Sequence, residues 1–415
     1  MLGKPPNQDQ LELFKATLKQ IIDPKHPLLI LAQAIPWKKL EEEFESLYSH
    51  TGAPSHHLRK MIGLLLLQRI YNLSDERVVA LWRENPYFQY FCGEASFQWE
   101  QPCAASDLVH FRKRLGKKGI EALFALSVHM HGNKLAKAKQ VLVDTTVQEK
   151  NITYPTDAKL YKKVIQRCTT LAQRVGVKLR QSYRYVSQKL FSAQSYAHVA
   201  KHAKKASKAV KKLRTLAGRQ VRDLTRKLQG AGQLAAYEEE LSLMDRIVKQ
   251  ARKDKQKVYS LSSPEVSCIA KGKVHKKYEF GSKVSLATLP GSNVVVGVEN
   301  FCGNPHDSKT LSVTLDSIHR MFGKEFSSVL VDRGYRGHGQ VGSSEVILTG
   351  SCQGKSASSR RQHKTRCRGR SAIEAIIGHL KSEHRLSRNY LKGRVGDGMN
   401  ALLVAIGFNL SLLLA

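Results

Sequence analysis

Two short apolar runs, each followed directly by an aspartate, constrain the fold of this chain most strongly. One run is Val141–Val143 before Asp144, and the other is Val329–Val331 before Asp332. Such β-branched, apolar residues favour buried strands, yet an unpaired carboxylate in a core is costly. A metal ion or another cation would offset that cost. The sequence therefore predicts two strands that each deliver a carboxylate to a charged site.

A third acidic residue lies on a predicted helix between two cations. Arg370, Glu374 and Lys381 are spaced by four and seven residues. At roughly 100° per residue, they fall within about 40° of one another on one helical face. The opposite face carries apolar residues that can pack into a core: Ile373, Ile376 and Leu380. A carboxylate flanked by two cations suits a metal ion and the phosphates that it activates.

Simpler interpretations compete for these carboxylates, because a strand-end aspartate is commonly a turn or helix-capping residue. Other acidic residues are weaker candidates for the third position. Glu383 lies about 180° round the helix from Glu374, so both cannot face one site. Asp157 is interpreted as capping the helix that begins next to it. His306 and Asp307 are interpreted as shaping a loop after a strand.

The charge of the chain indicates a polyanionic partner. Its 415 residues include 68 Lys and Arg against 34 Asp and Glu, which gives a net charge of +34. That excess is far beyond what solubility needs, and double-stranded DNA fits it. An RNA-binding protein is disfavoured, because aromatic residues make up 7% of the chain and no stacking motif is present.

Cysteine usage and hydropathy predict a cytoplasmic protein with no membrane partner, and a DNA partner would make it nucleoid-associated. Seven cysteines without a CxxC pair indicate a reducing compartment and no structural zinc. The first ten residues are polar and do not resemble a signal peptide. The apolar runs 61–66 and 402–415 are shorter than the ~20 residues that span a bilayer.

Residues 1–130 are predicted to be all-helical. One helix covers Ser55–Tyr71, and Ser74 caps a second helix that ends before Pro86. Two helices joined by a short turn resemble a helix-turn-helix. Sequence-specific DNA reading and a bundle or dimerisation role both remain open for this region.

A long basic segment separates the first predicted strand from the others. The first strand is residues 140–148. Further strands are predicted at residues 258–260, 265–270, 284–288, 294–298, 327–331 and 345–349. Between them, residues 157–256 carry 25 Lys and Arg against 7 Asp and Glu, with predicted helices at Ala197–Leu228 and Gln233–Lys255. A phosphate-backbone clamp is favoured over a solvated charged hairpin.

The three carboxylates predict metal-dependent chemistry on phosphodiesters. Two divalent cations some 3.5–4 Å apart can activate one phosphodiester oxygen and stabilise the other. Oxygen ligands suit Mg²⁺, with Mn²⁺ as the alternative. We therefore predict Asp144, Asp332 and Glu374 as catalytic residues and metal ligands. Metal-free acid–base catalysis is less attractive, because no histidine lies beside either aspartate in sequence.

Several motifs together match a known family. Arg370, Glu374 and Lys381 fit a signature Tyr-(2)-Arg-(3)-Glu-(6)-Lys within IEAIIGHLKSEHRLSRNYLKG, although Cys367 stands at the tyrosine position. Further matching segments are VDTTVQEKNITYPTD, VDRGYRGH, CIAKGKVHKKYEFGSKVSLAT at 268–288, IPWKKLEEEF and MIGLLLLQRIYNLSDERVVALWRENPYFQYFCG. Over nearly its whole length, the chain resembles bacterial insertion-sequence transposases of the DDE type, in the group numbered five.

The resemblance implies an α+β architecture that contains an α/β core. A helical N-terminal domain of residues 1–130 would bind DNA or dimerise. Residues 138–415 would form an RNase H-like catalytic core, a mixed five-stranded sheet with helices on both sides. A basic helical insertion at about 157–256 would separate its first two strands. Asp144 would lie on the first strand, Asp332 at the end of the fourth and Glu374 on a late helix.

The resemblance also implies a function. The protein would bind the terminal inverted repeats of its own element as a dimer or higher oligomer, and cleave and transfer DNA strands with two Mg²⁺ ions. Arg370 and Lys381 would contact the DNA backbone. Arg333 and Tyr335 would order the turn after Asp332 or touch phosphate. Two rivals share these residues: a nuclease without strand transfer, and a non-catalytic DNA-binding descendant, for which Cys367 leaves room.

Overall fold

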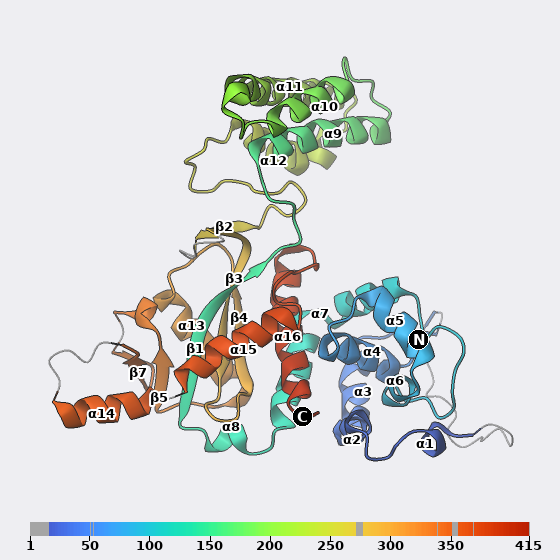
Figure 1. Cartoon of the computed structure of the whole chain (residues 1–415). Helices are drawn as coiled ribbons and strands as arrows, with labels where there is room; N and C mark the ends of the chain where they lie inside the picture. The colour runs from blue at the N-terminus through green and yellow to red at the C-terminus, as the bar shows by residue number, and fades with distance from the viewer. Residues whose placement is uncertain are drawn as a thin grey trace. The chain divides into compact units, whose positions relative to one another are not determined.

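The computed structural model describes residues 16–49, 51–52, 54–270, 277–337, 339–350, 356–367 and 369–414. The polar first ten residues, and residues 271–276 of the motif at 268–288, lie outside these ranges. The chain forms two compact units, one made of Met1–Glu149 and Ser282–Ala415 and the other of Lys150–Gly281 (Figure 1). Within the described ranges, no helix has the length and apolar character needed to cross a membrane.

The N-terminal part of the first unit is helical, as predicted. Its helices are α1 (Leu18–Ile21), α2 (Pro27–Ala34), α3 (Trp37–Glu45), α4 (Leu58–Ile70), α5 (Asp75–Glu84), α6 (Pro86–Phe91), α7 (Ala105–His129) and α8 (Lys134–Lys137). The predicted cap is confirmed, because Ser74 Oγ accepts a hydrogen bond from the Arg77 amide at 3.1 Å. Asn85 then caps α6, and Pro86 occupies the first position of that helix.

The C-terminal helix α16 (Gly393–Ser411) shares one hydrophobic core with the N-terminal helices α4 and α7. Arg69 at the end of α4 is buried, and its Nη1 donates to Asn400 Oδ1 at 2.8 Å. A Cβ atom on Gly407 would stand 2.7 Å from the Arg69 carbonyl oxygen. The close approach of α16 to α4 therefore depends on a glycine at position 407.

This contact predicts opposite effects for two glycine substitutions in α16. Gly407→Ala should lower the free energy of unfolding by about 1–3 kcal/mol, because the new methyl group meets backbone that cannot move freely. Gly398→Ala meets nothing within 4 Å and should raise it by about 0.5–1 kcal/mol through helix propensity. Urea denaturation of the full chain measures both values. Equal stabilities for the two variants would contradict this packing.

The first unit also contains a mixed sheet. Its strands are β1 (Gln140–Glu149), β3 (Tyr278–Thr288, from Ser282 onward), β4 (Val295–Phe301), β5 (Ser328–Val331), β6 (Gln340–Val341) and β7 (Ser344–Leu348). Their order is β4-β3-β1-β5-β7-β6. The pairs β1–β5 and β5–β7 are parallel, whereas β3–β4 and β6–β7 are antiparallel. Together with the helical N-terminal region, this sheet makes the fold α+β, as predicted.

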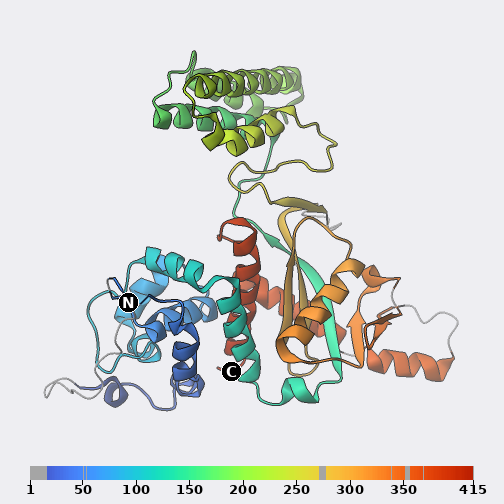
Figure 2. The same ribbon diagram turned by 180° about the vertical axis from the view of Figure 1, so that it is seen from behind.

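Helices cover both faces of this sheet. Helix α13 (Ser308–Phe322) lies on one face, and α15 (Arg370–Ser382) lies on the other (Figures 1 and 2). Helix α14 (Ala357–Arg366) precedes α15. A single-turn 3-10 helix, η3 (Arg333–Tyr335), follows β5 directly. These connections bring the segments after β5 and β7 to the edge of the sheet where the central strands end.

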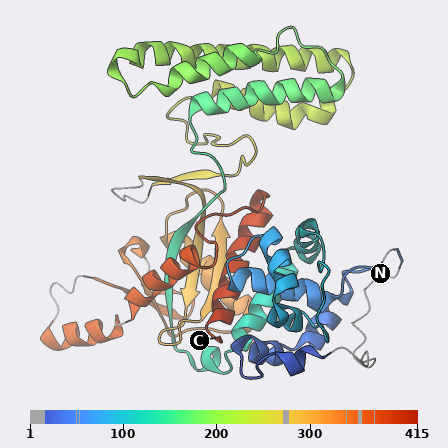
Figure 3. The ribbon, with the colours of Figure 1, turned by 45° about the vertical axis from the view of Figure 1, so that its right-hand side comes forward.

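The second unit is a four-helix bundle with its own hydrophobic core. Its helices α9 (Asp157–Val175), α10 (Arg184–Ser195), α11 (Ala203–Gly230) and α12 (Glu238–Lys249) lie side by side (Figure 3). The short strand β2 (Ser267–Ala270) pairs antiparallel with the first residues of β3. Thr156 caps α9 by accepting from the Lys159 amide, and Asp157 pairs instead with Lys257 at 2.8 Å.

Three predicted helix boundaries and one predicted strand in this unit are wrong, since the helix predicted from Gln233 begins only at Glu238. The helix predicted from Ala197 begins only at Ala203, after a 3-10 turn. The helix predicted to end at Lys255 ends at Lys249, because Asp254 Oδ2 accepts from the Ala251 amide at 2.7 Å and closes a competing turn. Residues 258–260 form no strand, because the side-chain amide of Gln250 takes both backbone hydrogen bonds of Val258.

Candidate active site

The pairing of β1 with β5 brings two of the predicted carboxylates together. The strands run parallel with Leu142 opposite Leu330. Continuing that register by two residues places Asp144 beside Asp332, on strands that lie about 4.8 Å apart. Because side chains alternate between the faces of a sheet, both aspartates emerge on the face that carries the two leucines.

A small apolar cluster docks α15 against this same face. Its buried members are Leu142, Leu330, Ile347 and Ile373. Ile373 belongs to α15, the helix that also carries Arg370 and Glu374. Cys367 packs against the cluster too. The residue at the signature tyrosine position therefore packs against this apolar cluster.

Arg370 joins the three predicted carboxylates. Its Nη2 lies 3.4 Å from Asp144 Oδ2 and 3.8 Å from Asp332 Oδ2, and its Nη1 lies 2.6 Å from Glu374 Oε1. The exposed fractions of the side chains rise outward, from 14% for Arg370 and 15% for Asp144 to 41% for Asp332 and 64% for Glu374. One guanidinium group thus bridges carboxylates from β1, the end of β5 and α15.

Each aspartate also accepts a hydrogen bond from backbone that is close to it in sequence. Asp144 Oδ1 accepts from the Thr145 amide at 2.7 Å, and Asp332 Oδ1 accepts from the Gly334 amide at 2.8 Å. The alternative capping function is therefore present for Asp332, which caps η3, whereas Asp144 lies within β1 and caps no helix. In both residues, Oδ1 is bound to the local backbone while Oδ2 faces Arg370.

The remaining predicted residues occupy different environments. Arg333 is exposed, and Lys381 is half-buried in the last turn of α15. Tyr335 is fully buried, with an exposed fraction of 0%, so its side chain is not placed to touch DNA in this arrangement. Burial raises the pKa of the Tyr335 phenol, and the nearby negative charges of Asp144, Asp307 and Asp332 raise this pKa further.

Asp307 is a further acidic residue at the site, which the sequence interpretation had assigned to loop shape alone. It lies immediately before α13. Its Oδ1 accepts from Thr145 Oγ1 at 2.7 Å and from Lys283 Nζ at 2.9 Å. Its sequence position gives a weaker signal than that of Asp332, because β4 ends at Phe301, six residues earlier, whereas Asp332 follows the last residue of β5.

The donor set fits a hard divalent cation. Among the described residues, no three His, Cys, Asp or Glu side chains are already gathered closely enough to hold an ion. Asp144 and Asp332 nevertheless hold one cationic group between them, the Arg370 guanidinium, and all the candidate donors are carboxylate oxygens. Oxygen donors of this kind are those that Mg²⁺ and Mn²⁺ prefer.

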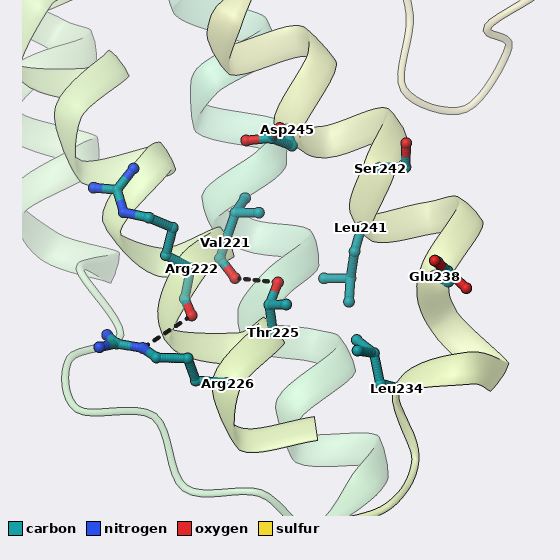
Figure 4. Close-up of a pocket in the computed structure, with 9 residues that line it drawn as sticks. All are labelled: Val221, Arg222, Thr225, Arg226, Leu234, Glu238, Leu241, Ser242 and Asp245. Carbon is teal, nitrogen blue, oxygen red and sulfur yellow. Dashed lines mark hydrogen bonds between the residues drawn. The ribbon is translucent and has the colours of Figure 1, made fainter. Parts of the chain in front are cut away.

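A cavity elsewhere lacks this chemistry. It measures about 500 Å³ and lies in the helical unit between α11 and α12 (Figure 4). Its floor is apolar, and Arg222 and Arg226 point away from Glu238 and Asp245 on the facing helix (Figure 4). The guanidinium of Arg226 donates to the backbone of its own helix. We therefore assign the candidate active site to the carboxylates around Arg370.

Comparison with known proteins identifies the class. Residues 16–114 match the family described as Transposase domain (DUF772), and residues 243–410 match the family described as Transposase DDE domain. The chain belongs to the DDE transposases, of the kind found in insertion sequences. Asp332, Arg370 and Glu374 lie inside the second matched range, and Asp144 lies between the two.

One relative is a protein of Rhizobium meliloti, "Uncharacterized protein ORF8 in nfe locus". It is 41% identical over 198 residues, which is 46% of this chain and 96% of that protein. No solved structure matches this chain.

Proposed function

We propose that this transposase binds the terminal inverted repeats of its insertion sequence and catalyses metal-dependent cleavage and transfer of DNA strands in the bacterial cytoplasm. The observation that carries this proposal is the convergence of Asp144, Asp332 and Glu374 on Arg370. These residues come from three separate elements, and such convergence is what a catalytic centre requires.

The strand order supports an RNase H-like core for the catalytic domain, at residues 138–415. Five strands in the order β4-β3-β1-β5-β7, with parallel central pairs and an antiparallel β3–β4 pair, are the arrangement that we expect for such a core. The helical unit, predicted as an insertion at about 157–256, follows the first of these strands. Residues 1–130 would recognise the DNA ends or form the dimer.

Asp144, Asp332 and Glu374 would hold two Mg²⁺ or Mn²⁺ ions. When bound, these ions would activate the attacking oxygen and stabilise the leaving oxygen at the scissile phosphate. Arg370 pairs with all three carboxylates in this structure. Arg370 and Lys381, together with the exposed Arg333, would bind the DNA backbone beside the site. Tyr335 would pack beneath the turn that carries Asp332 and so hold that carboxylate in place.

A cleavage and joining assay tests this proposal. Purified protein is incubated with Mg²⁺ and a labelled duplex that carries the inverted repeats flanking its own gene, beside an Asp332→Asn control. Nicks at the repeat ends and joined products, both lost in the control, are the expected result. Cleavage without joined products would show a nuclease. Tight end binding without cleavage in Mg²⁺ or Mn²⁺ would show a non-catalytic protein, and Cys367→Tyr would then be the next variant to assay.

The helical unit supports a second contribution, binding of the DNA phosphate backbone. Exposed cations follow the outer face of α11: Lys204, Lys205, Lys208, Lys211, Lys212, Arg219 and Arg222. The acidic residue of this helix, Asp223, pairs with Arg226 and Lys227 near its end. With 28 residues, α11 is about 42 Å long, which is about the length of 12 base pairs.

Neutralising part of this stripe should weaken DNA binding in a salt-dependent way. The double variant Lys208→Gln, Lys212→Gln should reduce the slope of log affinity against log salt by about 2, since each phosphate contact contributes about 0.9. A matched control replaces Lys117 and Lys249, each already paired with a carboxylate on its own helix. Fluorescence anisotropy with a duplex of arbitrary sequence measures the slope. An unchanged slope in the first variant would contradict the clamp.

A further inference from the structure

Asp307 is held in place by two elements of the sheet. Thr145 on β1 and Lys283 on β3 both donate to its Oδ1, at 2.7 and 2.9 Å. Lys283 Nζ also donates to the Pro305 carbonyl at 2.7 Å, which fixes the loop that leads to Asp307. The Lys283 side chain is 8% exposed, and a buried cation of this kind depends on its partner.

The other oxygen of Asp307 and one oxygen of Asp332 both lie close to Gly334. A Cβ atom on Gly334 would stand 3.1 Å from Asp307 Oδ2 and 3.0 Å from Asp332 Oδ1. Both oxygens therefore border the space that glycine at position 334 leaves open. An ion pair that served stability alone would not require the second oxygen of Asp307 to face this space.

Thr145 links Asp307 to the other side of the site. Its backbone amide donates to Asp144 Oδ1, and its hydroxyl donates to Asp307. Asp307 thus contacts the residue that orients Asp144, and it borders the turn that orients Asp332. A shift of Asp307 would move both carboxylates that face Arg370.

We propose that Asp307 is a positioning residue of the metal centre. It holds the Asp144 strand against the Asp332 turn, and Lys283 and Thr145 fix it there. This inference rests on the proposed metal-dependent function. Residues in this outer position commonly change metal affinity by about 10- to 100-fold when they are replaced, because they orient the ligands themselves.

Asp307 could affect metal binding by positioning the ligands or by its negative charge alone. These two explanations predict different metal affinities for variants of its neighbours. Asp307→Asn removes one negative charge from the site and would weaken cation binding under either explanation. Lys283→Met removes a positive charge. A pure charge effect would then tighten cation binding, whereas loss of positioning would weaken it. Thr145→Val leaves the charge unchanged and should weaken binding only through lost positioning.

The test measures Mn²⁺ binding by electron paramagnetic resonance with the full chain and no DNA. Asp307→Asn, Lys283→Met and Thr145→Val should each weaken Mn²⁺ binding, the first by about tenfold or more. Asp332→Asn should abolish it. Glu94→Gln is the matched structural control, because it removes the buried Lys60–Glu94 pair, at 2.7 Å, far from these carboxylates in the sequence. Its Mn²⁺ affinity should equal that of the unmodified protein even if its melting temperature falls.

Three results would overturn the positioning role. These are unchanged binding in Asp307→Asn, tighter binding in Lys283→Met, or a loss in Asp307→Asn as complete as in Asp332→Asn, which would make Asp307 a ligand. Failure of the proposed function looks different, because Asp332→Asn would then bind Mn²⁺ as well as the unmodified protein does.

Discussion

Replacing Glu374 with alanine is expected to abolish strand cleavage while binding to the repeat ends survives. Loss of one metal ligand removes several kcal/mol of transition-state stabilisation, so the cleavage rate should fall by about 10³-fold or more. Stability should change little, because the Glu374 side chain is 64% exposed and pairs with Arg370 near the surface. Single-turnover cleavage of a labelled repeat end and a gel-shift assay measure the two effects.

The matched control is Glu383→Ala. Glu383 caps the C-terminal end of the same helix and pairs with His379 at 2.7 Å, away from the Arg370 cluster. This variant should cleave at the rate of the unmodified protein. If Glu383→Ala loses cleavage and Glu374→Ala retains it, the third carboxylate has been assigned to the wrong residue.

The two aspartates could be predicted because their signals are local. Val141–Asp144 and Val329–Asp332 have the same four residues, and each apolar run predicts a strand by itself. The register of β1 with β5 then aligns the two runs. The predicted division of α15 into an apolar face and a charged face is also confirmed, since Ile373 packs against the sheet and Arg370 faces the carboxylates.

Contacts between distant segments could not be predicted in this way. Asp307 meets Thr145 across 162 positions of sequence, and no spacing rule connects them. Of the two roles expected for Tyr335, ordering the turn or touching phosphate, the second does not fit the structure, because the turn after β5 directs the aromatic ring into the core. Burial of this kind depends on the tertiary packing of η3 against α13, which local sequence does not encode.

The contacts of Arg370 could likewise be predicted only in part, because some of them join distant segments. Its helical position predicted a cation beside Glu374, and that contact is present at 2.6 Å. Its simultaneous contact with Asp144 and Asp332 depends on how α15 docks, which is set by Ile373 and three apolar residues of the sheet. Arg370 therefore contacts the carboxylates themselves. The sequence had predicted a contact between Arg370 and the DNA backbone instead.

This position predicts that Arg370→Gln is destabilising without metal and is rescued by metal. Removing the guanidinium takes away the cation that lies between Asp144 and Asp332. The expected loss is about 2 kcal/mol, below the ~3–5 kcal/mol of a fully buried pair because Asp332 is 41% exposed. The melting temperature in EDTA should fall by several degrees.

Added Mg²⁺ or Mn²⁺ should then raise the melting temperature of Arg370→Gln more than that of the unmodified protein. The reason is that a ligand stabilises the folded state in proportion to its affinity, and the cation no longer competes with the guanidinium for the same oxygens. Arg333→Gln is the control, since Arg333 is exposed beside the same turn and should show the metal response of the unmodified protein. Equal metal responses in Arg370→Gln and Arg333→Gln would mean that Arg370 does not occupy the cation position, and its role would then be limited to DNA.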